Sequence, residues 1–194
     1  MKLIFATHNQ HKVEELKKLL PSNISILSLT DINCHEKIEE TGTTLEENAK
    51  LKANFIKYKY GLDCFADDSG LEVDALGGSP GVYSARYAGD KKNNEDNIKK
   101  IWEELSNKES TKAQFRTVIA SSFGSKNTIY EGKVIGNLIF EKRGNHGFGY
   151  DPIFIPEGYT KTFAELGDTV KNKISHRALA TQKFLTELLT TLKL

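Results

Sequence analysis

The chain has few cysteines, and this shortage excludes two classes of protein. Among its 194 residues only Cys34 and Cys64 carry thiols, so a disulfide-stapled scaffold is excluded. No CxxC or Cys/His spacing of a zinc site is present. We interpret both thiols as buried apolar groups in a reducing cytosol, because no apolar signal segment is found.

Net charge and long hydrophobic runs are also lacking. Lys and Arg number 27 against 26 Asp and Glu, which leaves a formal charge of +1. This balance gives no long-range attraction to a nucleic-acid polymer or an acidic membrane. No stretch approaches the roughly 18 apolar residues of a membrane span. We therefore expect a cytoplasmic protein that binds neither, folded as a single domain over residues 1–194 with two lobes.

What the chain does have is an alternation of strand-like and helix-like apolar patterns. Thr7 or Asn9 suits the cap of the first helix, and Thr44 with Glu47 suits a capping box. Three consecutive strand patterns without helices predict an antiparallel meander. The expected class is α/β with a mixed sheet and a cleft beside the meander. Strands are expected at 2–6, 24–29, 63–68, 114–123, 128–136 and 137–143, and helices at about 9–20, 44–60, 93–105 and 175–192.

Asp67 and Asp68 end an apolar run and meet Ser69 and Gly70, which we interpret as a turn. Carboxylates crowded at a strand end repel one another unless a cation or a proton intervenes. Mg²⁺ prefers one or two carboxylates together with substrate phosphates. The pattern favours a phosphate-handling hydrolase, and the alternative is that these acids cap a turn. A second acidic pair, Glu39 and Glu40, precedes the helix at 44–60, where capping is again the alternative.

The polar segment from Thr7 to Lys12 joins the first strand to the first helix. Backbone N–H groups and the positive end of the helix dipole make such a junction a phosphate cradle, and Lys12 adds a cation. The segment has neither the GxxxxGK[ST] nor the GxGxxG pattern of the common nucleotide folds. The alternative is an ordinary capped helix with a solvated lysine.

Two later segments offer groups for a nucleobase. The segment 147–152 interleaves glycines with Phe148 and Tyr150, and an aromatic face can stack on a base. An aromatic turn packed on the core is the competing interpretation. His176 and Arg177 begin the last helix and, with Lys171, offer donors to a carbonyl or a phosphate, with a charged surface as the alternative.

In this order the segments resemble the inosine/xanthosine triphosphate pyrophosphatase family, which hydrolyses non-standard purine nucleoside triphosphates to monophosphate and pyrophosphate. The Gly-x-Pro-Gly-x-x-Ser-Ala-Arg and Gly-Phe-Gly-Tyr-Asp-Pro strings are its most specific parts. Similar proteins commonly have a small residue where His8 stands in this first loop, and we expect the bulkier side chain to alter the loop's backbone. The resemblance rests on residues 7–12, 39–42, 47–49, 67–71, 78–86, 147–152 and 175–177.

The resemblance implies an elongated mixed β-sheet flanked by helices, two lobes with a central substrate cleft, Mg²⁺ as cofactor and a homodimer. It implies that ITP, dITP and XTP are the substrates. Asp68 is implied as the catalytic proton acceptor and, with Glu39, as a metal ligand. The implied substrate-binding residues are Thr7, His8, Asn9, Gln10, His11, Lys12, Lys52, Ser69, Phe148, Gly149, Tyr150, Asp151, Lys171, His176 and Arg177.

Base selection follows from polarity. Inosine and xanthosine carry an acceptor oxygen at position 6, where adenosine carries a donor amino group. We expect donors such as Arg177 to pair with that oxygen and to reject adenine. Two alternatives remain, a pyrophosphatase for modified pyrimidine or other nucleotides and a non-catalytic nucleotide sensor. Retention of Glu39 and Asp68 disfavours the sensor.

Overall fold

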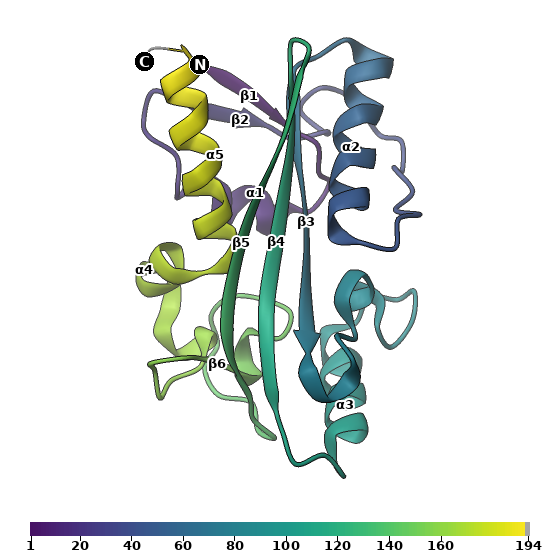
Figure 1. The fold of residues 1–194 in the computed structure, drawn as a ribbon, viewed down its shortest axis with the longest axis vertical. Coiled ribbons are helices and arrows are strands. Elements are labelled where there is room, and N and C mark those ends of the chain that lie inside the picture. Colours follow the sequence, from purple (N-terminus) through teal and green to yellow (C-terminus); the bar gives the residue numbers. More distant parts are fainter. Residues whose placement is uncertain (193–194) are drawn as a thin grey trace. The chain divides into compact units, whose positions relative to one another are not determined.

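The computed structural model describes residues 1–192, which form one six-stranded sheet in the order β2-β1-β3-β4-β5-β6 (Figure 1). Strand β1 pairs in parallel with β2 and β3, whereas β5 and β6 are antiparallel. The predicted α/β class with a mixed sheet and flanking helices is confirmed. The strands are β1 (Lys2–Phe5), β2 (Ser25–Leu27), β3 (Cys64–Val73), β4 (Lys112–Phe123), β5 (Lys126–Leu138) and β6 (Phe154–Pro156).

Within residues 1–192, five helices and three short 3₁₀ turns accompany the sheet. The caps predicted for two helices are present: Asn9 caps α1, and Thr44 with Glu47 forms a capping box at the start of α2. The helices are α1 (Gln10–Lys17), α2 (Leu45–Tyr60), α3 (Asn94–Leu105), α4 (Phe163–Ile174) and α5 (His176–Leu192), and the 3₁₀ turns are η1 (Asp74–Leu76), η2 (Gly81–Arg86) and η3 (Asp151–Ile153).

The chain divides into two compact units. The first comprises Met1–Asp68, Thr117–Gly132 and Arg177–Leu194, and the second comprises Ser69–Arg116 and Lys133–His176. Strands β3, β4 and β5 each contribute one part to each unit. The single domain with two lobes that the sequence predicts stays a prediction.

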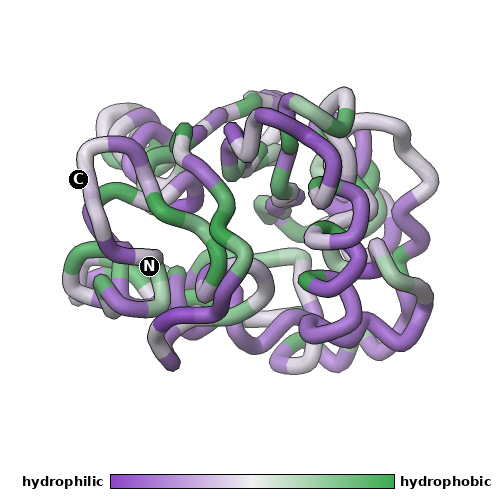
Figure 2. Tube along the Cα trace, turned by 90° about the horizontal axis from the view of Figure 1, so that it is seen from below, coloured by the Kyte–Doolittle hydropathy of each residue, from purple (hydrophilic) through white to green (hydrophobic). Residues whose placement is uncertain are grey.

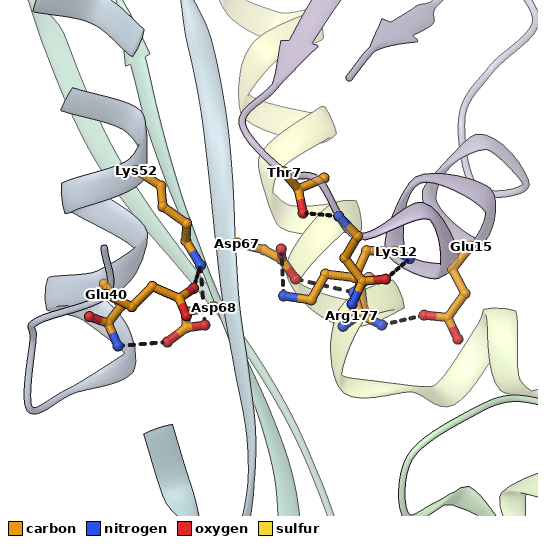
Figure 3. A network of polar contacts seen from close by, with 10 residues as sticks. Thr7, Lys12, Glu15, Glu40, Lys52, Asp67, Asp68 and Arg177 are labelled. Carbon is orange, nitrogen blue, oxygen red and sulfur yellow. Dashed lines mark hydrogen bonds and ion pairs between the residues drawn. The ribbon is translucent and has the colours of Figure 1, made fainter. Parts of the chain in front are cut away.

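In the first unit, helix α2 lies on one face of the strands, and α1 and α5 lie on the other (Figures 1 and 3). Phe5 of β1 stacks on Phe65 of β3 with ring centroids 4.8 Å apart, and Phe65 also contacts Phe184 of α5. Leucines and isoleucines of β1, β2, α1 and α5 complete this core. The apolar residues of the first and last segments of the chain are therefore buried together.

The second unit has its own core. Phe115 of β4 contacts Phe154 of β6 and Phe163 of α4, and the apolar side of α3 packs into the same cluster. The indole Nε1 of Trp102 donates to the carbonyl oxygen of Ile139 at 2.9 Å. Figure 2 shows hydrophobic stretches mostly inside the trace and hydrophilic stretches along much of its outside.

Two sequence predictions at glycines were wrong. Strand β3 does not turn at Ser69 and Gly70 but continues to Val73. A Cβ on Gly70 would overlap the carbonyl of Gly81, so this glycine allows a loop to approach the strand. Strand β5 likewise continues to Leu138 in place of two strands at 128–136 and 137–143, because Gly136 lets the backbone of Ile155 approach in β6.

Helix α4 was missed by the sequence analysis, although its start carries a signal. Thr162 accepts from the N–H of Glu165, and Glu165 accepts in return from Thr162. This is the same Thr-x-x-Glu capping box that identified α2. The backbone at Gly167 leaves the helical region, which interrupts the apolar periodicity that the prediction needs. Within residues 1–192, none of the helices has the length and hydropathy needed to traverse a lipid bilayer.

Candidate functional site

The parallel pairing of β1 with β3 brings two predicted segments together. Ile4 pairs with Cys64 and Phe5 with Phe65, so both strands run toward the same edge of the sheet. There β1 ends in the loop beginning at Thr7, and β3 reaches Asp67 and Asp68. Ligands of α/β proteins bind beyond the carboxyl ends of parallel strands. The segment 7–12, which the sequence predicts to bind phosphate and which we call the phosphate loop, follows this end of β1, whereas the acidic pair lies within β3, which continues to Val73.

Asp67 and Asp68 point to opposite faces of the sheet (Figure 3). This follows from their positions in an extended strand, where successive side chains alternate. The four crowded oxygens at a turn that the sequence predicted are therefore not observed. Instead, each carboxylate has its own set of cations.

Asp67 is only 2% exposed and lies on the face of α1 and α5. Its Oδ1 accepts from Lys12 Nζ at 2.9 Å, and its Oδ2 accepts from Arg177 Nε at 3.2 Å. Nη1 of Arg177 donates to Glu15 of α1. Burial alone raises the pKa of Asp67, but the charges of Lys12 and Arg177 bring it well below its usual range. We name Lys12, Glu15, Asp67 and Arg177 the Asp67 network.

Asp68 is 7% exposed and faces α2. Lys52 Nζ donates to its Oδ1 at 3.2 Å, and Asn48 Nδ2 donates to its Oδ2 at 3.2 Å. Lys52 also donates to Glu40 Oε1 at 2.6 Å. Burial raises the pKa of the Asp68 carboxyl, and Lys52 and Lys12 offset this only in part. Asp68 is therefore a stronger base than an ordinary aspartate, and both of its carboxylate oxygens are held by hydrogen bonds.

The ammonium of Lys52 bridges two carboxylates. Burial lowers its pKa, but the charges of Asp68 and Glu40 outweigh that effect and raise it above the ordinary value. Carboxylate oxygens converging on one positive charge are a donor set that suits Mg²⁺, which takes its remaining ligands from water and substrate phosphates. Within residues 1–192 no group of three or more His, Cys, Asp or Glu side chains is arranged to hold a metal by itself.

The structure brings Glu40 rather than Glu39 to Lys52. Glu39 is exposed and Glu40 is half-buried, so the neighbouring acid of the predicted pair makes the contact with the Asp68 site. Asn48 further fixes this region, since its Oδ1 accepts from the N–H of Gly42 at 2.8 Å. The metal-binding role of Glu39 stays a prediction.

The phosphate loop is ordered by its own polar side chains. Thr7 Oγ1 accepts from the N–H of Asn9 at 3.1 Å, and Asn9 Oδ1 accepts from the N–H of Lys12 at 3.2 Å. Gln10 and His11 are exposed in the first turn of α1. The ring Nε2 of His8 lies 2.9 Å from the carbonyl oxygen of Glu36.

In the second unit, Asp151 and Lys171 build the predicted aromatic turn. Asp151 Oδ2 accepts from the N–H of Phe148 at 2.8 Å and from Lys171 Nζ at 2.6 Å. The ammonium of Lys171 lies 5.1 Å from the ring centroid of Phe148. Tyr150 is buried and donates to the carbonyl of Ser84 at 2.8 Å. Phe148 and Gly149 line a cavity of about 490 Å³ beside the first turn of α3.

His176 and Ser69 take positions that their sequence context did not reveal. The imidazole of His176 is buried and stacks on Phe115 with centroids 4.7 Å apart, so it is also a core residue of the second unit. Ser69 is half-buried in β3, next to Asp68.

Glu15 was missed altogether. Its signal was its place three residues after Lys12, on the same side of a predicted helix. Glu40 was predicted only as a member of the acidic pair, and Asn48 only as part of the segment 47–49. Their contacts with Lys52 and Asp68 join segments about 12 to 20 residues apart, which local patterns do not reveal.

Comparisons with known proteins identify the family of this chain. The model of the Ham1 family matches residues 3–187. The dITP/XTP pyrophosphatase of Flavobacterium johnsoniae is 53% identical over 193 residues, covering 100% of both chains. That of Bacillus subtilis is 50% identical over 184 residues, covering 93% of each.

Solved structures give the same result. The Ham1 protein of Staphylococcus aureus superposes with a TM-score of 0.89 at 38% identity, covering 98% of this chain and 100% of that one. A HAM1 protein from Coxiella burnetii gives 0.90 at 37% identity, with 98% and 99% covered. The chain described here therefore belongs to the Ham1 family.

Proposed function

We propose that the protein hydrolyses non-standard purine nucleoside triphosphates, namely ITP, dITP and XTP, to the monophosphate and pyrophosphate. One observation carries this proposal: Asp68, buried and fixed at both oxygens by Lys52 and Asn48, lies beside Glu40 in the unit that also holds the phosphate loop. The names of relatives about half identical over the full chain support the same activity.

Lys12 and Lys52 have the charge that a triphosphate requires. A nucleoside triphosphate carries about four negative charges, which must be screened before water can attack phosphorus. Both ammonium groups are largely buried, where electrostatic interactions are stronger than in water. The capped N-terminus of α1 adds backbone N–H donors and the positive end of its dipole.

Asp68 accepts the proton of the attacking water in this mechanism. Asn48 and Lys52 each hold one carboxylate oxygen, so the carboxylate keeps one orientation without a change during the reaction. General-base catalysis of this kind contributes typically 10²–10⁴-fold in rate. Mg²⁺, when bound, would neutralise charge on the phosphates and leaving pyrophosphate. Asp68 and an acid of the Glu39–Glu40 pair would hold it.

We assign purine binding to side chains that offer an aromatic face for stacking and hydrogen-bond donors for the base. The backbone N–H of Phe148 donates to Asp151, and the Lys171 ammonium lies near the Phe148 ring, which offers an aromatic surface for stacking on a base. Arg177 was expected to donate to the 6-oxygen of the purine. Its Nε and Nη1 contact Asp67 and Glu15, which supports a role in positioning Lys12. Direct purine recognition by Arg177 stays a prediction, as do the other substrate contacts.

Pyrophosphate release tests the proposal. We expect Mg²⁺-dependent release from ITP, dITP and XTP, and far slower release from ATP, GTP and dUTP. Asp68→Asn is expected to lose at least 10²-fold in kcat and to remain folded. Asp74→Asn, an exposed acid in η1, is the matched control and should keep wild-type turnover. Faster release from dUTP would favour a pyrimidine pyrophosphatase, and saturable ITP binding without release would favour a sensor.

The acid that binds the metal is identified by a second pair of variants. Because Glu40 contacts Lys52 and Glu39 is exposed, Glu40→Gln is expected to raise the Mg²⁺ concentration at half-maximal rate more than Glu39→Gln does. The reverse order would support the metal role predicted for Glu39. We also propose a cytoplasmic homodimer, which family resemblance supports. Sedimentation should then give about twice the chain mass of 21.7 kDa.

A further inference from the structure

The side chain of His8, in the phosphate loop, makes a definite contact with a distant segment. Its Nε2 lies 2.9 Å from the carbonyl oxygen of Glu36, which is 28 residues away in the sequence. A carbonyl oxygen can only accept, so Nε2 carries the hydrogen.

The segment that His8 contacts leads directly to the acidic pair. Residues 34–42 contain neither helix nor strand. Their position therefore depends on individual tethers rather than on a ladder of backbone hydrogen bonds. Glu40, near the end of this segment, makes the contact with Lys52 in the Asp68 site.

A second tether acts on the same residue from the other side. Both carboxylate oxygens of Glu36 accept from Lys59 Nζ, at 2.6 and 2.5 Å, near the C-terminal end of α2. Helix α2 also carries Asn48 and Lys52. Glu36 is thus held through its carbonyl by the phosphate loop and through its carboxylate by α2.

We infer that His8 is a positioning residue that couples the phosphate loop to the segment carrying Glu39 and Glu40, by anchoring the backbone of Glu36. This inference rests on the proposed function and adds a residue role to it. His8 stabilises one arrangement of the acidic segment, and through it the site for the divalent ion. Its exposed hydrogen bond accounts for an effect of about 2- to 10-fold, the range expected for one such contact.

Limited trypsin digestion tests the tether without any measurement of activity. Lys37 is an exposed cleavage site inside the segment, and cleavage there requires local opening. His8→Ala is expected to accelerate cleavage after Lys37 about 2- to 10-fold, whereas His8→Gln, which keeps an N–H donor, should stay near the wild-type rate. Cleavage at the exposed Lys91 and Lys92 in the same digests is the internal control and should not change.

Lys59→Ala removes the other tether and leaves the phosphate loop intact. It is also expected to accelerate cleavage after Lys37. In the pyrophosphate assay, His8→Ala should raise the Mg²⁺ concentration at half-maximal rate about 2- to 10-fold, with KM for ITP at saturating Mg²⁺ changed less than 2-fold.

Two results would overturn the inference. One is an unchanged rate of cleavage after Lys37 in His8→Ala, and the other is equal acceleration in His8→Ala and His8→Gln. A rise in KM for ITP with unchanged cleavage would assign His8 to direct contact with the triphosphate instead. If the wild type released no pyrophosphate, the proposed function would fail, while the digestion would still show whether the tether exists.

Discussion

Asp67 and Asp68 are adjacent in the sequence and differ in every contact. Asp67 compensates two buried cations, Lys12 and Arg177, whereas Asp68 is presented to Lys52 and Asn48 on the other face of β3. A strand makes this separation without a turn, because its side chains alternate. Asp67 can then hold Lys12 in place while Asp68 is presented on the other face for the role that we propose for it.

Loss of Asp67 is expected to cost stability as well as activity. Asp67→Ala leaves Lys12 and Arg177 buried without their shared counter-charge, and breaking a buried pair in this way costs about 3–5 kcal/mol. Urea unfolding measures the change. The exposed pair of Asp63 and Lys57 is the control, since Asp63→Ala is expected to cost no more than about 1 kcal/mol. Equal losses in the two variants would contradict the assignment.

Cys64 gives a pH-dependent prediction. Its thiol is buried and donates to the carbonyl of Ala53, and burial raises its pKa to about 12. In the unfolded chain the pKa of a cysteine thiol is about 8.5. The folded state therefore favours the protonated thiol, and this contribution is complete below about pH 8.5 and lost as the pH rises toward 12.

The measurement compares wild type with Cys64→Ala, which cannot titrate. Between pH 7 and 10 the stability of wild type relative to the variant should fall by about 2 kcal/mol, since the slope approaches about 1.4 kcal/mol per pH unit above the unfolded pKa. Other titrating groups contribute equally to both proteins. If the free energies of unfolding of wild type and Cys64→Ala changed equally with pH, the prediction for the Cys64 thiol would be wrong.

At the scale of elements, two glycines decide where strands continue. The sequence analysis placed breaks at Gly70 and near Gly136, because glycine between apolar runs indicates a turn as often as a close approach. Which of the two applies depends on segments far along the chain, Gly81 and Ile155. The helices α1 and α2 were predicted with their caps, whereas the partner of β5 and the helix α4 were not, although α4 also begins with a capping box.

Gly136→Ala tests this interpretation. The added Cβ would overlap the backbone carbonyl of Ile155, which belongs to a strand and cannot move as a flexible side chain would. Overpacking of this kind costs about 1–3 kcal/mol. Lys133→Ala, at an exposed position of the same strand, should stay within about 0.5 kcal/mol in thermal or urea unfolding. An unchanged free energy of unfolding in Gly136→Ala would show that β6 can move to accommodate the added Cβ.

The candidate site was predicted in part, for a physical reason. Lys12, Asp68 and Arg177 belong to motifs that are readable in order along the chain, and the resemblance to the family implied Lys52. Glu15 and Asn48 owe their roles to contacts across 162 and 20 residues, respectively, made only after folding. The choice between Glu39 and Glu40 depends on the path of an irregular segment, for which the sequence has no periodic signal.

At the scale of the whole molecule, the three long strands decide how the two units unfold. Each of β3, β4 and β5 passes from one unit into the other without interruption. Melting one unit would remove strand pairing at the start of the other. We therefore expect one cooperative transition rather than two.

Trp102, the sole tryptophan, reports on the second unit. Phe184→Ala removes a ring from the core of the first unit and is expected to cost about 3–5 kcal/mol. If the two units unfold in a single transition, Phe184→Ala lowers the unfolding midpoint measured by Trp102 fluorescence and the midpoint measured by far-UV circular dichroism by the same amount. Tyr58→Ala, at an 86% exposed position, should shift neither. A circular dichroism shift without a fluorescence shift would indicate independent units.

The lysine that bridges Glu40 and Asp68 also bears on handling the protein. Because its ammonium already compensates both carboxylates, the fold of this region does not need a divalent ion. A chelator is expected to abolish pyrophosphate release and to leave the thermal midpoint unchanged, which calorimetry with and without EDTA would show. Purification in chelating buffers should then yield intact protein that regains full activity when Mg²⁺ is restored.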